Sequence, residues 1–228
     1  MLTTDEIKKL VAEHALSKVP DNAVVGLGSG TTAYYFTLAL AEKVKQGFSV
    51  KGVPTSNVIK TLAMEQGIPV VELNDVTTID ITVDGADEID PLLQLIKGGG
   101  GALLQEKMVA AASKELVIIA DYSKLVKRLG KFPLPVEVIP YGWKQVQQVI
   151  EKQYAIKTSL RQQDQQPYVT DHGHYILDCS FKKIKDAASL AVELNQIPGV
   201  VEHGLFIDMA DEVIVGNKDG SLKVLRRS

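Results

Sequence analysis

The stretch NAVVGLGSGTTAYYFTLALAEKVKQG, residues 22–47, decides the fold of this chain. An apolar run of strand length is followed by a glycine-rich loop, and then by a segment of helical length that ends at Gly47. The sequence FSVKGVP, residues 48–54, predicts another strand directly afterwards. A strand, a helix and a second strand in succession are typical of a parallel sheet that is covered by helices.

The same alternation extends in both directions from this stretch. Upstream, Thr3 and Glu6 have the spacing of a capping box, and the helix that they begin is predicted to end near Ser17. We therefore expect an α/β fold with a Rossmann-like parallel sheet and helices on both faces. In such sheets ligands bind at the carboxyl ends of the strands, and each polar cluster described below, apart from the histidines, is predicted to lie at such an end. Downstream, the pattern predicts a helix at 56–67, strands at 68–74 and 79–84, a helix at 102–113 and a strand at 116–121.

The pattern changes after the prolines of KFPLP, residues 131–135. The order becomes strand, helix, strand, strand, helix, strand, which is the βαββαβ order of a ferredoxin-like unit. We predict a small α/β domain at 131–206, with subunit contacts, and a larger Rossmann-like catalytic domain at 1–130 that is rejoined by 207–228. The segment 210–225 predicts a hairpin that turns at residues 218–220 and returns to the first sheet. The predicted elements of the small domain are strand 136–140, helix 143–153, strands 155–161 and 175–181, helix 186–197 and strand 199–206.

The composition is that of a globular protein. Of its 228 residues 45% are hydrophobic and 23% charged, and 25 basic side chains oppose 28 acidic ones, so nothing suggests a nucleic-acid partner. The N-terminus carries acids and no export signal, and the uncharged span 22–41 is interrupted by glycines, so no membrane segment is expected. The single Cys179 excludes an intramolecular disulfide and suits a reducing compartment. We expect a cytoplasmic protein.

The loop GLGSGTT follows a predicted strand and opens a predicted helix. Backbone N–H groups and the helix dipole favour an anion there, so the loop is a candidate phosphate cradle. It fits the permissive G-x-G-x-x-A form of the dinucleotide fingerprint, but no acid lies between Glu42 and Glu65 to hold a ribose, and the lysine of a P-loop is absent. A tight turn without a ligand is the alternative. The candidate phosphate-binding residues are Ser29, Gly30, Thr31 and Thr32.

The loop DGADEID places Asp84, Asp87, Glu88 and Asp90 after another predicted strand. Carboxylates so close together repel one another and some of their pKa values rise, which suits proton transfer or a cation. The spacing is not that of an EF-hand, and no histidine lies nearby in the sequence. A solvated acidic turn is the alternative.

The sequence KGGGGALLQE, residues 97–106, joins a predicted strand to a helix through four glycines. Backbone without side chains lets a ligand approach, and its N–H groups can point at developing negative charge. Lys97 adds a positive charge beside this oxyanion site, and Glu106 lies early in the helix, where it can act as a base. The alternative is a flexible turn with an ordinary surface lysine and glutamate.

Two further groups of residues are weaker candidates. Lys124 follows the strand predicted at 116–121 and supplies local positive charge for an anionic substrate, although a solvated side chain is the alternative. His172 and His174 form an isolated H-x-H on a turn without a third ligand, so metal binding is not expected there.

Six motifs in order make the chain similar to ribose-5-phosphate isomerase type A, and the similarity covers nearly its whole length. The resemblance implies interconversion of ribose 5-phosphate and ribulose 5-phosphate in the non-oxidative pentose phosphate pathway, with no metal or cofactor, by a homodimer or homotetramer. It departs from the family at His172, Gly173 and His174, where the family often has Asn-Gly-Asn. The motifs are GSGTT, VDGADEID, KGGGGALLQEK, ADYSK, GKFPLPVEVIP and IPGVVEHGLF.

The resemblance also implies roles for single residues. Glu106 is implied as the acceptor of the C2 proton, Asp84 as the ring-opening group assisted by Asp87, and Lys97 with the glycine loop as the stabiliser of a cis-enediolate. Two other classes share parts of the pattern: a sugar-phosphate sensor domain, and a CoA transferase with a nucleophilic glutamate. The implied substrate contacts are Ser29, Gly30, Thr31, Thr32, Asp84, Gly85, Ala86, Asp87, Lys97, Gly98, Gly99, Gly100 and Lys124.

Overall fold

A computed structural model describes residues 1–227, which group into two compact units. Unit 1 contains residues 1–86, 105–124 and 209 onward, and unit 2 contains residues 87–104 and 125–208. The predicted domain boundaries differ from this division because they place residues 87–104, 125–130 and 207–208 with the larger part. The division into two domains with the boundaries given above therefore stays a prediction. In the described residues no helix combines the length and the apolar character needed to cross a membrane.

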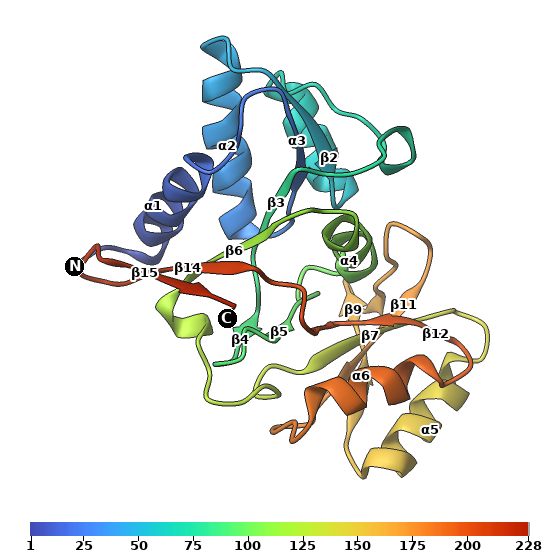
Figure 1. Cartoon of the computed structure of the whole chain (residues 1–228). Coiled ribbons are helices and arrows are strands. Elements are labelled where there is room, and N and C mark those ends of the chain that lie inside the picture. Colours follow the sequence, from blue (N-terminus) through green and yellow to red (C-terminus); the bar gives the residue numbers. More distant parts are fainter. Residues whose placement is uncertain (228) are drawn as a thin grey trace. The chain divides into compact units, whose positions relative to one another are not determined.

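Unit 1 is built on a six-stranded sheet in the order β15-β14-β6-β3-β1-β2 (Figure 1). All neighbouring strands are parallel except β14 and β15, so the parallel α/β fold predicted from the sequence is confirmed. The strands are β1 (Ala23–Leu27), β2 (Val50–Pro54), β3 (Ile81–Asp84), β6 (Leu116–Asp121), β14 (Glu212–Gly216) and β15 (Leu222–Arg226). The helices are α1 (Thr4–Leu16), α2 (Thr31–Lys45), α3 (Asn57–Glu65) and α4 (Leu103–Ala111), whose first two residues belong to unit 2.

Helices cover both faces of this sheet, as the alternation along β1 shows. Val25 packs in a core with Val11 of α1 and Phe36 of α2. Its neighbour Val24 packs with Val109 of α4 in a second cluster. Successive side chains of a strand point to opposite faces, so α1 and α2 lie on one face and α4 on the other.

Local signals explain where several elements of unit 1 begin and end. Thr3 caps α1 in a capping box with Glu6, and the helix ends at Ser17, both as predicted. The uncharged span 22–41 is a strand, a loop and the start of a helix. The strand predicted at 68–74 is wrong, because this segment makes only an isolated bridge between Val70 and Gly52 and then a single 3₁₀ turn, Leu73–Asp75.

The predicted C-terminal hairpin is present, and it completes the sheet of unit 1. β14 pairs in parallel with β6, and β15 turns back along β14 (Figure 1). The carboxylate of Glu212 in β14 lies 2.7 Å from Lys18 Nζ, just beyond α1, and 2.8 Å from Arg226 Nε in β15. These ion pairs join the first helix of the chain to its last strand.

Unit 2 contains the predicted ferredoxin-like arrangement. Its four-stranded antiparallel sheet has the order β12-β7-β11-β8, and α5 and α6 connect its strands in the βαββαβ sequence. Ile150 of α5 and Leu194 of α6 pack with Leu177 of the sheet. The elements are β7 (Leu134–Val138), α5 (Trp143–Tyr154), β8 (Thr158–Leu160), β11 (Tyr175–Cys179), α6 (Ala187–Asn195) and β12 (Val200–His203), with a short hairpin of β9 (Gln162–Gln163) and β10 (Gln166–Pro167).

A small three-stranded sheet, which the sequence did not predict, completes unit 2. It contains β4 (Glu88–Ile89), β5 (Leu95–Ile96) and β13 (Leu205–Phe206). The single strand predicted at 199–206 is therefore two strands in different sheets, separated at Gly204. A Cβ at Gly204 would lie 2.2 Å from the carbonyl oxygen of Lys97, so only glycine permits the chain to pass so close there.

Candidate active site

Four strands of unit 1 end in polar loops at one edge of the sheet. β6, β3, β1 and β2 are neighbours in the sheet and parallel, so their carboxyl ends meet at the same edge. Lys124 and Ser29 follow β6 and β1, and Asp84 is the last residue of β3. Within unit 1, the structure therefore brings the phosphate-loop candidate, the first acid and the second lysine to one edge, as expected.

The loop after β1 presents the start of α2 without a side-chain cap. The N-cap is Gly30, whose φ of 88° lies in the region that favours glycine, and no side chain accepts a hydrogen bond from the first turn. A Cβ at Gly30 would have no other atom within 4 Å. The helix N-terminus at Thr31 and Thr32 therefore faces open space and favours an anion.

Two hydroxyl groups that the sequence analysis missed lie beside Ser29. The Ser29 hydroxyl is 2.8 Å from both the Thr55 and the Ser56 hydroxyl. Thr55 also donates to the carbonyl of Leu27, and Ser56 caps α3. Their position directly after β2, the neighbour of β1, is the signal that could have identified them.

Asp84 is buried at the end of β3, with 1% of its surface exposed. Its Oδ1 accepts hydrogen bonds from the backbone N–H of Ser29, at 3.0 Å, and of Gly85, at 2.7 Å. A Cβ at Gly28 would lie 2.3 Å from the same oxygen, so this glycine lets the carboxylate approach the loop. Gly85 and Ala86 continue from Asp84 to Asp87, where the chain enters unit 2.

Asp87 and the glycine loop form a second group, in unit 2. Asp87 Oδ2 accepts a hydrogen bond of 2.8 Å from the N–H of Gly99, and the N–H of Gly101 donates to the carbonyl of Gly98. Two of the N–H groups of the loop are thus occupied. In the part of the chain that the structure describes, the N–H groups of Gly98 and Gly100 have no hydrogen-bond partner, so these two are the candidate donors to a ligand.

The glycine loop does not follow a strand of the parallel sheet, contrary to expectation. It follows β5, which pairs with β4 and β13 in the antiparallel sheet of unit 2. Lys97, between β5 and the loop, is only 2% exposed, and its Nζ lies 5.5 Å from the centre of the Phe206 ring. Glu106 is in the first turn of α4, which begins directly after the loop, and is 5% exposed.

Lys124 ends a 3₁₀ turn, Tyr122–Lys124, that follows β6. The turn is held by Asp121, whose carboxylate accepts hydrogen bonds from the N–H and the hydroxyl of Ser123. Lys124 is half-buried and makes no ion pair with the described residues. Its charge is available to an anionic ligand at this edge of the sheet.

The other two acids of the acidic loop have structural roles. Glu88 accepts hydrogen bonds of 2.7 and 2.6 Å from the N–H groups of Gly130 and Phe132. Asp90 accepts hydrogen bonds from the N–H groups of Leu92 and Gln94, and burial raises its pKa in spite of these bonds. The loop therefore divides, with Asp84 and Asp87 beside the glycine-rich loops and Glu88 and Asp90 supporting the fold.

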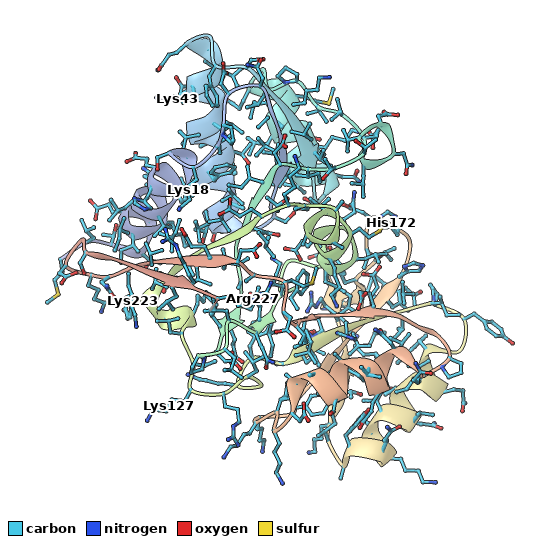
Figure 2. All side chains as sticks on the ribbon, viewed as in Figure 1. Lys18, Lys43, Lys127, His172, Lys223 and Arg227 are labelled. Atoms are coloured by element: carbon cyan, nitrogen blue, oxygen red, sulfur yellow. The ribbon has the colours of Figure 1, made fainter. Side chains whose placement is uncertain are left out.

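The two histidines of the H-x-H motif do not act together. His174 Nδ1 is 2.9 Å from the buried carboxylate of Glu137, which also accepts a hydrogen bond from Thr170. His172, labelled in Figure 2, is exposed. Among residues 1–227, no group of three or more histidine, cysteine, aspartate or glutamate side chains is arranged to hold a metal ion.

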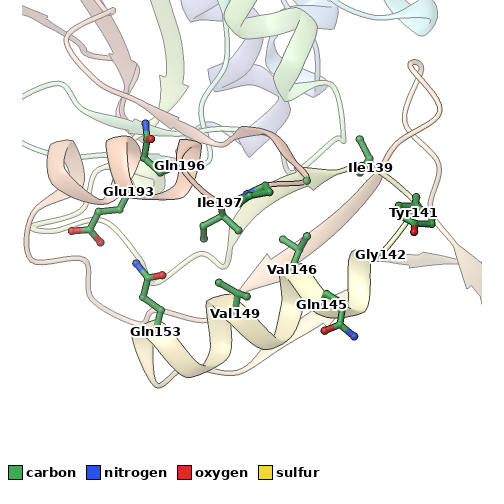
Figure 3. Close-up of a pocket in the computed structure, with 12 residues that line it drawn as sticks. Ile139, Tyr141, Gly142, Gln145, Val146, Val149, Gln153, Glu193, Gln196 and Ile197 are labelled. Carbon is green, nitrogen blue, oxygen red and sulfur yellow. The ribbon is translucent and has the colours of Figure 1, made fainter.

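An apolar groove of about 730 Å³ lies elsewhere in unit 2, between α5 and α6 (Figure 3). Val146, Val149 and Ile197 line it, and the exposed Tyr141 stands at its end. None of the candidate site residues lines this groove. Cys179 is buried in the core of unit 2, and burial raises the pKa of its thiol.

Comparison with known proteins identifies the family. The model of a family described as ribose 5-phosphate isomerase A (phosphoriboisomerase A) matches residues 51–220. Ribose-5-phosphate isomerase A 1 of Oceanobacillus iheyensis is 50% identical over 216 residues, which cover 94% of this chain and 96% of the relative.

Solved structures give the same result over the whole fold. A D-ribose-5-phosphate isomerase in complex with phospho-erythronic acid superposes with a TM-score of 0.96 at 43% identity, covering 99% of this chain and 100% of that one. Ribose 5-phosphate isomerase A from Methanocaldococcus jannaschii superposes with a TM-score of 0.93 at 42% identity, covering 98% and 100%. The resemblance inferred from the motifs is confirmed, and the chain belongs to the ribose 5-phosphate isomerase A family.

Proposed function

We propose that the two glycine-rich loops, the acidic loop and α4 supply one active site, at which the chain interconverts D-ribose 5-phosphate and D-ribulose 5-phosphate. Membership of the family makes it an aldose–ketose isomerase of the non-oxidative pentose phosphate pathway. The observation that carries the site assignment is that the glycine loop and Glu106 of α4 are neighbours along the chain. A buried carboxylate, Glu106, stands in the first turn of the helix that directly follows a backbone loop with unpaired N–H groups. A base next to donors for an oxyanion is the arrangement that enolisation requires.

The 5-phosphate binds at the N-terminus of α2 in this proposal. The N–H groups of residues 30–32 supply donors, and Lys124 supplies positive charge from the same edge of the sheet. Thr55 and Ser56 hold the Ser29 hydroxyl in place. The overall charge of the protein is −3, so the attraction for an anion has to be local.

Ring opening comes before isomerisation, because ribose 5-phosphate is mainly a closed furanose. Asp84 moves the proton between the ring oxygen and the anomeric hydroxyl, and Asp87 assists. Two backbone N–H groups hold one oxygen of the Asp84 carboxylate, which fixes its direction at the loop. Asp87 is held in the same manner by the N–H of Gly99.

Proton transfer between C2 and C1 is assigned to Glu106. The carboxylate removes the C2 proton, which gives a cis-enediolate, and returns the proton to C1. Lys97 and the N–H groups of the glycine loop balance the charge that develops on the two sugar oxygens. Lys97, at 2% exposed, has little water around it, and its interaction with the enediolate is stronger for that reason.

Conversion of ribose 5-phosphate to ribulose 5-phosphate by the purified protein tests this assignment directly. A sugar-phosphate sensor would bind the substrate and leave it unchanged. A CoA transferase would accumulate an acyl-enzyme on a glutamate when given a thioester, and trapping of that species would support the rival.

Assembly and location are further parts of the proposal. We place the protein in the cytoplasm because its single cysteine suits a reducing compartment. A homodimer or homotetramer is supported by the resemblance, with the small domain predicted at 131–206 making subunit contacts.

A further inference from the structure

Three consecutive carbonyl groups of the glycine loop accept hydrogen bonds from one short hairpin of unit 2. Arg161 Nη1 donates to the carbonyl oxygens of Gly98, at 2.8 Å, and Gly99, at 3.1 Å. The hydroxyl of Tyr168 donates to the carbonyl oxygen of Gly100, at 3.3 Å. Arg161 and Tyr168 flank the hairpin of β9 and β10, and the Tyr168 N–H donates to the Arg161 carbonyl. The loop is thus held along its carbonyl side by two neighbouring residues.

Arg161 is itself fixed before it reaches the loop. Its Nε and Nη2 donate to the two carboxylate oxygens of Asp178 in β11, at 3.0 and 2.5 Å. Its backbone N–H donates to Ile176 of the same strand. The paired, planar contact leaves Nη1 pointing at the loop with little freedom, which a lysine at this position would not reproduce.

Peptide geometry transmits this arrangement to the N–H groups. In a trans peptide the C=O of one residue and the N–H of the next point in opposite directions. Holding the Gly98 carbonyl therefore directs the Gly99 N–H, which donates to Asp87. Holding the Gly99 carbonyl directs the Gly100 N–H, one of the two without a partner in residues 1–227. The guanidinium charge also polarises both peptide groups and makes their N–H groups better donors.

Tyr168 contacts the C-terminal end of the glycine loop, at Gly100 and Gly101. A Cβ at Gly101 would lie 2.3 Å from the Tyr168 hydroxyl, so the phenol packs directly against the backbone. The Tyr168 hydroxyl is protonated at neutral pH and can donate, and burial raises its pKa further above the ordinary value of 10.0. A run of four glycines is costly to order, since fixing a backbone residue costs about 1–2 kcal/mol and glycine loses the most freedom. The two residues supply contacts that offset this cost.

We propose that Arg161 and Tyr168 are positioning residues of the isomerase: they hold the glycine loop so that the Gly100 N–H faces the enediolate, and Asp178 orients Arg161. The inference rests on the proposed function, because it takes the glycine loop as the site of enediolate charge. It assigns to these residues no contact with the substrate. Their effect belongs to the transition state and not to the binding of the phosphate.

The test compares Arg161→Lys and Tyr168→Phe with the parent protein for kcat, KM and two inhibition constants. Phospho-erythronic acid presents a planar, charged carboxylate in place of the enediolate, and inorganic phosphate probes the phosphate site alone. Arg161→Lys should lower kcat by about 10- to 100-fold, somewhat less than the loss of a whole oxyanion donor. Its inhibition constant for phospho-erythronic acid should rise by a similar factor, whereas KM and the phosphate constant stay within about twofold. Tyr168→Phe should show the same pattern with a change of about three- to tenfold.

Controls separate this proposal from a purely structural role and from a wrong site. Arg128→Lys makes the same substitution at an exposed arginine without an ion pair in the described residues, and it should change nothing. If both test variants keep the parent kcat and the parent affinity for phospho-erythronic acid, positioning by this pair is refuted, whatever their melting temperatures. Should Arg161→Lys fail to fold, Tyr168→Phe, which removes one oxygen atom, decides alone. Near-normal turnover of Glu106→Gln in the same series would instead refute the site itself.

Discussion

Three charged side chains assigned to catalysis are almost completely buried. Asp84, Lys97 and Glu106 expose 1%, 2% and 5% of their surface. Charged groups are rarely buried to this degree unless they are paired or hydrogen-bonded. The free energy of removing a charged group from water is several kcal/mol, and even a neutral polar group costs about 2 kcal/mol or more. Two backbone N–H groups meet this requirement for Asp84. The burial of these three charged side chains supports the proposal that they take part in the chemistry.

Replacement of Glu106 by glutamine tests the base. The amide fills the same space but cannot accept the C2 proton, so kcat should fall by about 10²- to 10⁴-fold, the usual contribution of a positioned general base. Exchange of the C2 hydrogen with solvent deuterium should fall with it, because both pass through the same abstraction. Glu65→Gln, at an exposed position of α3, is the matched control. A variant that is less stable but exchanges C2 hydrogen at the parent rate would show that Glu106 only supports the helix.

At the scale of single residues, the sequence reveals which residue types are present but not which side chains contact one another in the fold. The four acids of residues 84–90 look equivalent along the chain. Glu88 is distinguished only by its bonds to Gly130 and Phe132, which are 42 and 44 positions away. Thr55 and Ser56 escaped notice for a similar reason, because they meet Ser29 only when β1 and β2 pair. Arg161 reaches the loop across 62 and 63 positions, and no local pattern marks it.

At the scale of elements, the start of α2 and the ends of the parallel strands define the proposed phosphate site. Alternating strands and helices could be predicted because apolar periodicity is local. The separate sheet of β4, β5 and β13 could not, because its strands are very short and its pairing joins residues 95–96 to 205–206. The strand predicted at 68–74 failed because only Val70 pairs with β2 before the chain turns. Apolar residues alone do not decide whether an edge segment pairs.

Thr31→Glu tests the N-terminus of α2. The new carboxylate would repel a phosphate at the helix end, where a unit charge is worth about 1–2 kcal/mol, so phosphate should bind about tenfold more weakly. KM for ribose 5-phosphate should rise with the inhibition constant of inorganic phosphate. Thr61→Glu introduces the same charge at an exposed site within α3 and should have little effect. Unchanged phosphate affinity in Thr31→Glu would place the phosphate elsewhere.

The junction of α1, β14 and β15 predicts a dependence of stability on pH. Burial raises the pKa of Glu212, but hydrogen bonds and charge from Lys18 and Arg226 outweigh it, so the pKa lies below its ordinary value of 4.5. A carboxylate with a lowered pKa in the folded state stabilises fully above its unfolded pKa, and the contribution is lost as the pH falls through the folded value. Glu212→Gln should therefore lower the free energy of unfolding at pH 7 by about 1–3 kcal/mol.

Urea unfolding of the parent and of Glu212→Gln between pH 7 and pH 3 measures this contribution. The difference between the two proteins should be constant near neutrality and shrink below about pH 4.5, as the parent carboxylate takes up a proton. Glu65→Gln again serves as the control, since its carboxylate makes no ion pair in the described chain. A difference that stays the same at pH 3 would assign the loss to packing and not to charge.

At the scale of the whole molecule, the residues that we propose for the site belong partly to one unit of the chain and partly to the other. Residues 29–32, 84–86, 106 and 124 belong to unit 1, and residues 87 and 97–100 belong to unit 2. Between the first and the last of these site residues, the chain passes from one unit to the other twice: at residues 86–87, and within α4 at residues 104–105. The sequence could predict both parts of the fold, because each has its own pattern, but not the contacts that assign residues 87–104 to unit 2.

Light scattering tests the expected assembly. The mass of one chain is 24.8 kDa, and a homodimer or homotetramer should give a multiple of two or four. Substitution of the exposed Tyr141 and Val149, which line the groove of unit 2, tests whether the small domain makes the subunit contacts. A single-chain mass for the active enzyme would contradict the oligomer, and a parent-like mass for the double variant would move the contact away from this groove.

The sheet of unit 1 is completed by β14 and β15, which has a consequence for biosynthesis. α1 packs on β14, where a side chain at Gly216 would collide with Ile7 and Val11, and Leu2 donates a hydrogen bond to Lys218. While β14 and β15 are still inside the ribosome, β6 lacks one of its two neighbours in the sheet and α1 lacks part of its support. Unit 2 ends at residue 208 and is therefore synthesised completely before unit 1. Although domains commonly fold from the N-terminus onward during translation, the proposed phosphate loop precedes unit 2 in the chain and yet belongs to the unit that is completed after it.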